Sequence, residues 1–279
     1  MKKICIIALI ATLVMGCTHN SLSPNLKFMS FNIRNSGPWA TAEDGDNCWA
    51  NRREAVVSMI LAEQPDAIGM QETLPEQMDY LDSALSGLYN RIGVGRDDGD
   101  RDGECMCIYY RTDRLALLDQ HTYWLSPTPD SVSFGWDAAC RRTVTVGHFR
   151  DLKTDSTFVY MNTHLDHVGK EARRNSILLL CKLSQDYSCP VILGGDMNST
   201  LEDSIFLPLA EAGLISARDI ADTTDNATTY NAYGKGPDAQ IDHFFVRGWS
   251  KATSFHTLNG DYGVPYISDH YPVSTTLEY

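Results

Sequence analysis

Five short segments of the chain carry asparagine, carboxylate or histidine side chains at the end or the start of an apolar stretch. Asparagine and carboxylate oxygens are hard ligands of the kind that Mg²⁺ and Mn²⁺ prefer. Histidine can hold a phosphate or exchange a proton near neutral pH. This set of side chains is therefore typical of metal-assisted phosphoester hydrolysis. The five segments are Asn32, Glu72, His164, Asp196-Met197-Asn198 and Asp269-His270.

These side chains need a scaffold that brings them together, and the apolar stretches beside them predict one. The first four segments each follow a stretch that is typical of a strand, whereas Asp242 and Asp269-His270 come before strands. Loops that leave strand ends at one edge of a layered sheet protein commonly build its active site. Strands running antiparallel from that edge would bring Asp242 and Asp269-His270 to the same place.

Hydrophobic periodicity predicts more strands than helices, and the long helices fall between strands. That pattern favours two mixed sheets packed face to face with helices outside. We expect helices at 51–63, 74–85, 169–184 and 202–212. We expect strands at 26–33, 66–70, 106–110, 115–124, 143–149, 157–162, 191–194, 241–246 and 271–277.

Each motif taken alone has an ordinary structural explanation. Gln71-Glu72 after a strand is usually a surface carboxylate, and an Asp-His pair in a loop is equally unspecific. Gly194-Gly195 can serve a tight turn alone, because glycine tolerates conformations that other residues avoid. Five such segments in this order and at this spacing rarely arise by chance, so we interpret them together.

With these segments in place, the sequence resembles the endonuclease/exonuclease/phosphatase superfamily from about Leu26 to the C-terminus. The resemblance implies an α+β fold, a four-layer α/β/β/α sandwich of two mixed β-sheets flanked by helices, with the site at one edge. Trp136-Asp137-Ala138-Ala139 with Arg142 resembles a bacterial subgroup of exported hydrolases. The shared motifs are Ser30-Phe31-Asn32, Gln71-Glu72, Asn162-Thr163-His164-Leu165-Asp166-His167, Gly195-Asp196-Met197-Asn198, Ile241-Asp242-His243-Phe244 and Ser268-Asp269-His270.

The resemblance also implies a role for each matching residue. Glu72 is the chief ligand of Mg²⁺ (or Mn²⁺), and Asn32 and Asp269 lie at the same metal. Asp196 and Asn198 orient the attacking water and bind the phosphate or a second metal.

The remaining roles concern the phosphate and the proton. His164 donates to a phosphate oxygen, and Arg142 clamps the phosphate. His270 is the general base or the stabiliser of the transition state, oriented by Asp242. The family usually has Tyr where this chain has His243, and we expect His243 to point into the core or a neighbouring strand.

The N-terminus has the pattern of an export signal. Lys2 and Lys3 precede the apolar run 4–15, and Gly16-Cys17 ends it as in a bacterial lipobox. We therefore expect a signal peptide at 1–16, a lipidated N-terminus and tether at 17–25, and one catalytic domain at 26–279. The product would be an exported, membrane-anchored lipoprotein on the periplasmic or cell-surface face. An ordinary signal peptide that happens to contain Cys17 is the alternative.

Composition restricts the choice of partners. Apolar residues make up 43 % of the 279 residues, as in a globular protein, and the formal net charge is −13. Binding to long nucleic acids depends on a basic surface, so such substrates are disfavoured, although bound metal can reverse the local field.

We expect a monomer that contacts the membrane only through its anchor. The six cysteines after Cys17 fit mostly buried free thiols, with room for one disulfide.

These observations predict a divalent-metal-dependent phosphoester hydrolase in which water attacks phosphorus. The expected substrate is a small or lipid-derived phosphoester, and an extracellular endonuclease or exonuclease is the alternative within the enzyme class. A non-catalytic surface-binding lipoprotein on the same fold is the alternative of another class. Exposed aromatic residues such as Trp39, Trp49 and Trp136 would form its sugar-binding platform.

Overall fold

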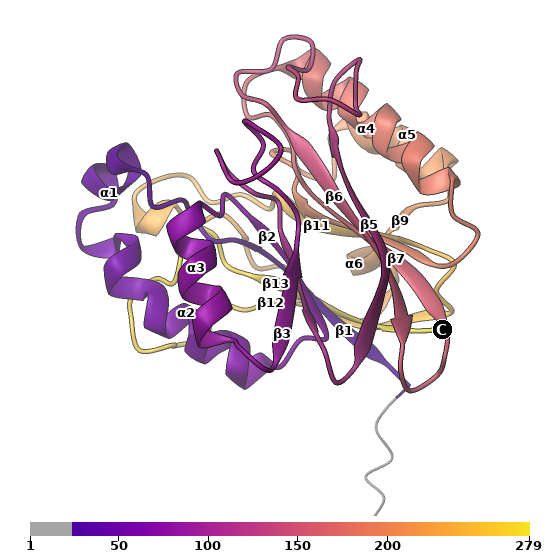
Figure 1. Ribbon diagram of the computed structural model, residues 1–279, viewed down its shortest axis with the longest axis horizontal. Helices are drawn as coiled ribbons and strands as arrows, with labels where there is room; N and C mark the ends of the chain where they lie inside the picture. The colour runs from indigo at the N-terminus through magenta and orange to yellow at the C-terminus, as the bar shows by residue number, and fades with distance from the viewer. Residues whose placement is uncertain (1–23) are drawn as a thin grey trace, which may run out of the picture.

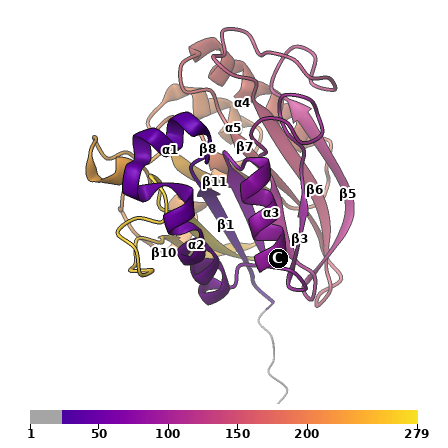
Figure 2. The same cartoon turned by 60° about the vertical axis from the view of Figure 1, so that its left-hand side comes forward.

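A computed structural model describes residues 24–279 (Figure 1). The predicted signal peptide and Cys17 lie outside the described residues. The chain forms two mixed β-sheets packed face to face, with helices on both outer faces (Figure 1, Figure 2). This arrangement confirms the predicted four-layer α/β/β/α sandwich.

The first sheet has seven strands in the order β10-β12-β13-β1-β2-β4-β3. Its central strands β1 and β2 are parallel, with Asn32 opposite Gln71 in the register. Strand β13 pairs with β1 in the antiparallel direction. The bounds are β1 Leu26–Asn32, β2 Ala67–Gln71, β3 Tyr89–Ile92, β4 Ile108–Arg111, β10 Ala221–Thr224, β12 Lys251–Thr257 and β13 Val273–Glu278.

The second sheet has six strands in the order β5-β6-β7-β8-β11-β9. Strands β7 and β8 are parallel, with His164 opposite Asp196. Strand β11 pairs antiparallel to β8, and this pairing places Asp242 opposite Asp196. The bounds are β5 Leu115–Trp124, β6 Thr143–Asp151, β7 Thr157–His164, β8 Val191–Asp196, β9 Ile215–Ser216 and β11 Asp242–Arg247.

The helices cover the two outer faces of the sandwich. Helices α2 and α3 bury one apolar stripe each against the seven-stranded sheet, around Met29 and Phe31 of β1. Helices α4 and α5 pack in the same way on the six-stranded sheet, around Met161 of β7. The bounds are α1 Pro38–Asp44, α2 Trp49–Glu63, α3 Pro75–Ala84, α4 Lys170–Gln185, α5 Leu207–Glu211 and α6 Ala217–Ile220, with short 3₁₀ turns at Gly45–Asn47, Ser204–Phe206 and Ala232–Gly234.

The core between the sheets is rich in aromatic side chains, and a buried polar bridge at Asn162 lies near the edge that carries the site. Phe28 of β1 meets Phe158 of β7 edge to face, with ring centroids 5.3 Å apart. Closer to the strand ends, Asn162 of β7 donates to the carbonyl oxygens of Met70 and Cys107 and accepts from Gln71. Because buried polar groups are costly when unpaired, this bridge fixes how the two sheets face each other.

The structure corrects two expectations from the sequence and supports a third. The segment 202–212 is not one helix: it is a 3₁₀ turn followed by the short α5, because Pro208 lacks the backbone donor that a continuous helix needs at that point. Trp49 is buried at the start of α2 against Tyr80, so it cannot belong to an exposed aromatic platform. All six cysteines among residues 24–279 are free thiols, as the sequence favoured, and three of them, Cys105, Cys107 and Cys181, are buried.

Candidate active site

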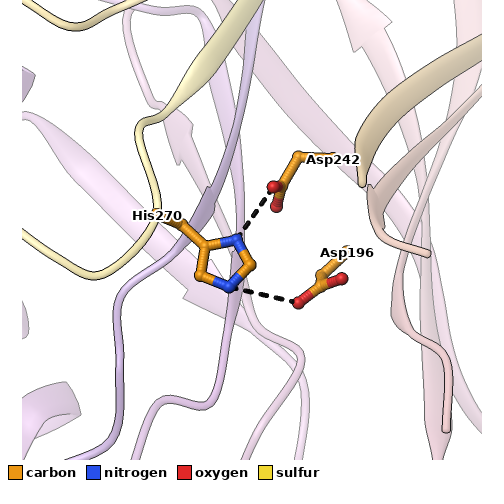
Figure 3. A group of neighbouring side chains, drawn as sticks. All are labelled: Asp196, Asp242 and His270. Atoms are coloured by element: carbon orange, nitrogen blue, oxygen red, sulfur yellow. Dashed lines mark hydrogen bonds and ion pairs between the residues drawn. The ribbon is translucent and has the colours of Figure 1, made fainter. Parts of the chain in front are cut away.

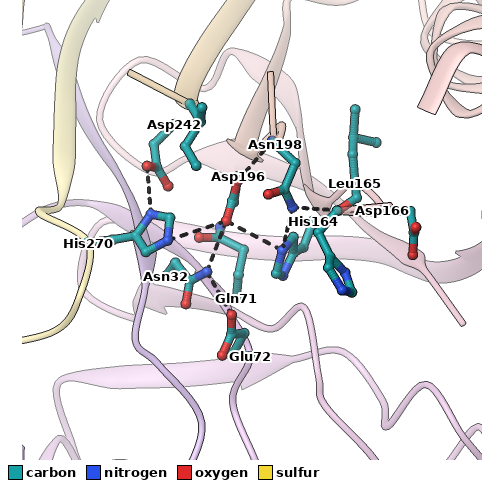
Figure 4. A network of polar contacts seen from close by, with 12 residues as sticks. Asn32, Gln71, Glu72, His164, Leu165, Asp166, Asp196, Asn198, Asp242 and His270 are labelled. Atoms are coloured by element: carbon teal, nitrogen blue, oxygen red, sulfur yellow. Dashed lines mark hydrogen bonds and ion pairs between the residues drawn. The ribbon is translucent and has the colours of Figure 1, made fainter. Parts of the chain in front are cut away.

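The ends of strands from both sheets meet at one edge of the sandwich (Figure 4). The parallel pairs β1–β2 and β7–β8 bring Asn32, Glu72, His164 and Asp196 there. The antiparallel strand β11 begins at the same edge with Asp242. The structure thus brings the sequence-predicted residues of the two sheets together around a cavity of about 560 Å³.

Three residues around the cavity adopt left-handed backbone conformations. The φ angles are 58° at Arg34, 64° at Glu72 and 48° at Asn198. Such conformations are uncommon for residues other than glycine and collect at functional sites, where the surrounding structure enforces them. Here each follows closely after a strand end, and the conformation turns the chain sharply at the cavity.

Glu72 is held by three hydrogen bonds. Its Oε1 accepts from Asn32 Nδ2 at 3.0 Å. Its Oε2 accepts from the backbone N and the Nδ2 of Asn35, at 3.0 and 2.9 Å. Burial opposes the charge, but these hydrogen bonds and the nearby Arg34 keep the pKa of Glu72 below its usual value. The carboxylate is therefore ionised and fixed in orientation.

Asp269 lies across from Glu72 at the same cavity. Its Oδ1 accepts from Ser268 Oγ at 3.2 Å, and its Oδ2 lies 3.8 Å from Arg34 Nη1. Burial and the charge of Glu72 raise the pKa of Asp269. Two carboxylates that repel each other across a cavity form an acidic site that fits a divalent cation such as Mg²⁺. The Asn32 amide would have to turn to offer its oxygen to the ion, because its Nδ2 donates to Glu72 and its Oδ1 accepts from Arg34 N.

Asp196, Asp242 and His270 form a second compact group (Figure 3). His270 Nδ1 lies 2.8 Å from Asp242 Oδ2, and Nε2 lies 3.6 Å from Asp196 Oδ2. Burial works against a charge on His270, but the two carboxylates outweigh it and raise its pKa to about 10. Because both ring nitrogens face carboxylates, this group suits a protonated imidazolium better than a metal ligand.

His164 and Asn198 form a third group on the opposite side of Asp196. Asn198 Nδ2 donates to the Leu165 carbonyl at 2.9 Å and contacts His164 Nε2 at 3.0 Å. Burial lowers the pKa of His164, so its ring is neutral. Since the amide donates to Nε2, the ring proton sits on Nδ1, and donation to a phosphate through Nε2 requires Asn198 to turn.

Arg142 lines the cavity beside this group. Its Nε donates to Asp166 Oδ2 at 3.2 Å, and its Nη2 lies 2.9 Å from His167 Nδ1. Asp166 is itself held by backbone donors, including Ala139 N at 3.1 Å, which keep its pKa well below the usual range despite burial. The guanidinium is thus held against the cavity wall by a carboxylate that is always charged.

Several residues at the cavity were not singled out from the sequence, among them Arg34, Asn35, Arg96, Glu104 and Tyr230. Arg34 and Asn35 come within three residues of Asn32, so their proximity to the predicted ligand was the available signal. Arg96 and Glu104 come from the loop between β3 and β4, and no strand end marks them. Arg141, the neighbour of Arg142, does not line the cavity and pairs with Asp97 at 3.1 Å.

His243 lies away from the cavity, as the sequence predicted. Its ring is buried and Nε2 lies 3.0 Å from the Ser199 carbonyl. The ring packs edge to face against Phe206, with centroids 5.8 Å apart. The alternation of strand side chains turns His243 toward Phe206 while Asp242 faces His270.

A two-sheet sandwich with carboxylate, amide and imidazole groups gathered where both sheets end has the architecture of a phosphoester hydrolase. Comparison with known proteins gives the family. The chain belongs to the endonuclease/exonuclease/phosphatase family, whose family model matches residues 29–270.

Three relatives illustrate the similarity. The crystal structure of an endonuclease/exonuclease/phosphatase from Bacteroides vulgatus is 34 % identical, with a TM-score of 0.85 over 91 % of this chain and 98 % of that chain. The structure of a mannosyl-6-phosphatase from Bacteroides thetaiotaomicron is 32 % identical, also with a TM-score of 0.85, over 91 % of this chain and 100 % of that chain. The uncharacterised protein L388 of Acanthamoeba polyphaga mimivirus is 28 % identical over 82 % of this chain and 92 % of that protein.

Proposed function

We propose that this chain is a Mg²⁺- or Mn²⁺-dependent phosphoester hydrolase that acts on a small, soluble phosphoester by attack of water on phosphorus. The observation that carries the proposal is the convergence of three groups on one cavity. These are the carboxylates Glu72 and Asp269, the His270 imidazole between two carboxylates, and the His164–Asn198 pair.

Each group has a distinct part in the proposed reaction. Glu72, Asp269 and Asn32 would hold the metal, which when bound would neutralise developing negative charge on the phosphate. Asp196, in contact with Asn32 Nδ2 at 3.0 Å, would align the attacking water and accept its proton.

The remaining groups would bind the phosphate. His270, charged between Asp242 and Asp196, would stabilise the phosphorane-like charge of the transition state. Arg142 and Asn198 lie on the other side of Asp196 and would fix the phosphate oxygens. No residue of this arrangement needs to form a covalent intermediate.

The cavity and the charge favour a small substrate over a nucleic acid. A volume of about 560 Å³ is in the range of small-molecule sites. A formal net charge of −13 works against a long phosphate backbone. The similarity to a mannosyl-6-phosphatase supports a phosphate monoester. An extracellular nuclease remains the alternative within the enzyme class, and a non-catalytic binding protein the alternative outside it.

Metal removal tests the proposal directly. Protein is treated with EDTA, dialysed and assayed with 4-nitrophenyl phosphate and bis(4-nitrophenyl) phosphate. It should hydrolyse these esters at least roughly 10²-fold more slowly than protein given back Mg²⁺ or Mn²⁺, because the cation supplies several kcal/mol of charge stabilisation in the transition state. Released 4-nitrophenolate is the readout. Protein that cleaves neither ester with either metal would favour the non-catalytic alternative, and equal rates with and without metal would refute metal dependence.

We further propose that the chain is exported and anchored through a lipid on Cys17, facing the periplasm or the cell surface. Among residues 24–279 no helix has both the length and the apolar character to cross a bilayer. Wild-type protein should therefore sediment with membranes, and Cys17→Ala should release it into the soluble fraction, because a diacyl-type anchor supplies most of the membrane affinity. Immunoblots of the two fractions give the answer. Fully soluble wild-type protein would contradict the lipobox interpretation.

A further inference from the structure

The loop between β3 and β4 is fixed against both sheets at the cavity. Arg96 N donates to the Glu104 carbonyl at 3.1 Å, so the two residues face each other across a hairpin-like turn. Cys105 N donates to the Thr73 carbonyl at 2.8 Å just after β2, and Trp124 Nε1 at the end of β5 donates to the Arg96 carbonyl at 2.8 Å. Anchors on two different sheets make this loop a rigid wall of the cavity.

The side chains of Arg96 and Glu104 form an ion pair in that wall. Arg96 Nη1 lies 2.5 Å from Glu104 Oε2, and the side chains are only 12 % and 14 % exposed. Both line the cavity. Arg96 Nε is buried and has no hydrogen-bond partner among residues 24–279. The proposed hydrolysis uses neither side chain, so this nearly buried pair is available for another part of the substrate.

We propose that Arg96 and Glu104 form a leaving-group subsite that recognises adjacent hydroxyl groups, and that the substrate is therefore a phosphorylated sugar or related polyol. This inference rests on the proposed function. The carboxylate of such an ion pair accepts a hydrogen bond from one hydroxyl, and the guanidinium donates to the hydroxyl next to it. Two adjacent hydroxyls therefore form hydrogen bonds with both members of the pair. A polyol phosphate places such hydroxyls a few bonds from its phosphorus, which a cavity of this size accommodates.

The aromatic residues at the cavity favour a polyol over a nucleobase. Recognition of unpaired bases depends on stacking against aromatic side chains. The two such side chains at this cavity are already in contact with other site residues. The Arg34 guanidinium lies 4.8 Å from the ring centroid of Trp39, and the ring of Tyr230 lies 5.0 Å from that of His270. Part of each ring is therefore already in contact, which limits stacking of a base, whereas hydroxyl groups need only the Arg96–Glu104 pair.

The test compares substrates with and without hydroxyls in the leaving group. Wild type and Glu104→Gln are assayed with glucose 6-phosphate, mannose 6-phosphate, singly deoxygenated analogues of these, 4-nitrophenyl phosphate and a short single-stranded oligodeoxynucleotide, all with Mg²⁺. We expect Glu104→Gln to lower kcat/KM for the preferred hexose phosphate roughly 10- to 100-fold, as for loss of a hydrogen bond to a charged group, and to leave the aryl phosphate within about twofold. Deleting the recognised hydroxyl should cost the wild type about as much and cost the variant little.

Asp97→Asn is the matched control. It makes the same carboxylate-to-amide change in the same loop and breaks the ion pair to Arg141, but it does not line the cavity. It should leave both kinds of substrate unaffected. Thermal unfolding shows whether each variant folds. If Glu104→Gln is unfolded, Arg96→Lys replaces it, because lysine keeps the positive charge but lacks the fork-shaped donor set of arginine.

Several results would overturn the inference. Equal losses on sugar and aryl phosphates would show that Glu104 acts on the whole site and not on the leaving group. Unchanged hexose phosphate hydrolysis in the variant would show that Glu104 makes no contact with the sugar. A wild type that cleaves the aryl phosphate or the oligonucleotide but no sugar phosphate would refute this inference and leave the proposed hydrolase function intact. Wild type that cleaves no phosphoester would refute both.

Discussion

Glu72→Gln is expected to lower phosphoester hydrolysis by roughly 10³-fold at low Mg²⁺, because a cation that neutralises phosphate charge contributes several kcal/mol to the transition state. The change removes one negative charge from the pair of carboxylates that faces the cavity. Both Glu72 oxygens accept hydrogen bonds from Asn32 or Asn35. The NH₂ group of the new glutamine would therefore face an N–H donor of one of these residues instead of an acceptor. We expect only a small loss of folding stability, and partial recovery of the rate when Mg²⁺ is raised.

Glu76→Gln provides the control for charge alone. Glu76 lies four residues further along in the first turn of α3, is exposed, and does not line the cavity. Its replacement should change neither the rate nor its dependence on Mg²⁺. The measurement is the rate of 4-nitrophenyl phosphate hydrolysis against Mg²⁺ concentration, with urea unfolding in parallel. A Glu72→Gln protein with the wild-type rate at low Mg²⁺ would exclude Glu72 as the main ligand.

Asp242 and His270 are expected to act as one unit. Removing either should lower kcat at saturating Mg²⁺ by roughly 10²- to 10⁴-fold, because His270 is oriented and kept charged by Asp242 at 2.8 Å. Groups that act together give strongly non-additive losses. His270→Ala, Asp242→Ala and the double variant should therefore show similar residual rates. Losses that multiply would show that the two residues act independently.

Unfolding measurements separate this coupling from damage to the fold. His270→Ala leaves the Asp196 and Asp242 carboxylates buried without their shared cation, which destabilises the protein. The double variant also removes the Asp242 carboxylate, so it should be more stable than His270→Ala alone. The exposed pair His121 and Asp130, 3.7 Å apart on the surface, provides the matched control, and the same substitutions there should change neither rate nor stability.

The sequence could predict the architecture because most elements carry a clear local pattern. Strand β5 was expected over its observed bounds, and α2 and α4 within two residues, because their apolar positions have the spacing of strand or helix. The edge strand β3, the strand β12 next to the other edge and the short α1 were not expected. Their side chains are partly exposed, so local periodicity is weak, and pairing with neighbouring strands forms them.

The candidate site was predictable only in part for a similar reason. Glu72, Asp196 and His270 stand beside strand ends, so the strand pattern marks them. Arg96 and Glu104 meet across a loop whose shape depends on hydrogen bonds to Thr73, which follows β2 of the first sheet, and to Trp124, which ends β5 of the second. Such distant anchoring leaves no local signal. The left-handed conformation at Glu72 is equally hidden, because no glycine marks the position.

The direction of β1 has a consequence for where the enzyme can find its substrate. The described chain enters the domain at Leu26, and the same strand delivers Asn32 to the cavity at its other end. Seven extended residues span roughly 20 Å. If Cys17 carries a lipid, the tether therefore joins the described domain at the end of β1 that lies away from the cavity. Attachment at that end favours a cavity that opens toward the surrounding solution over one that faces a phospholipid in the same leaflet.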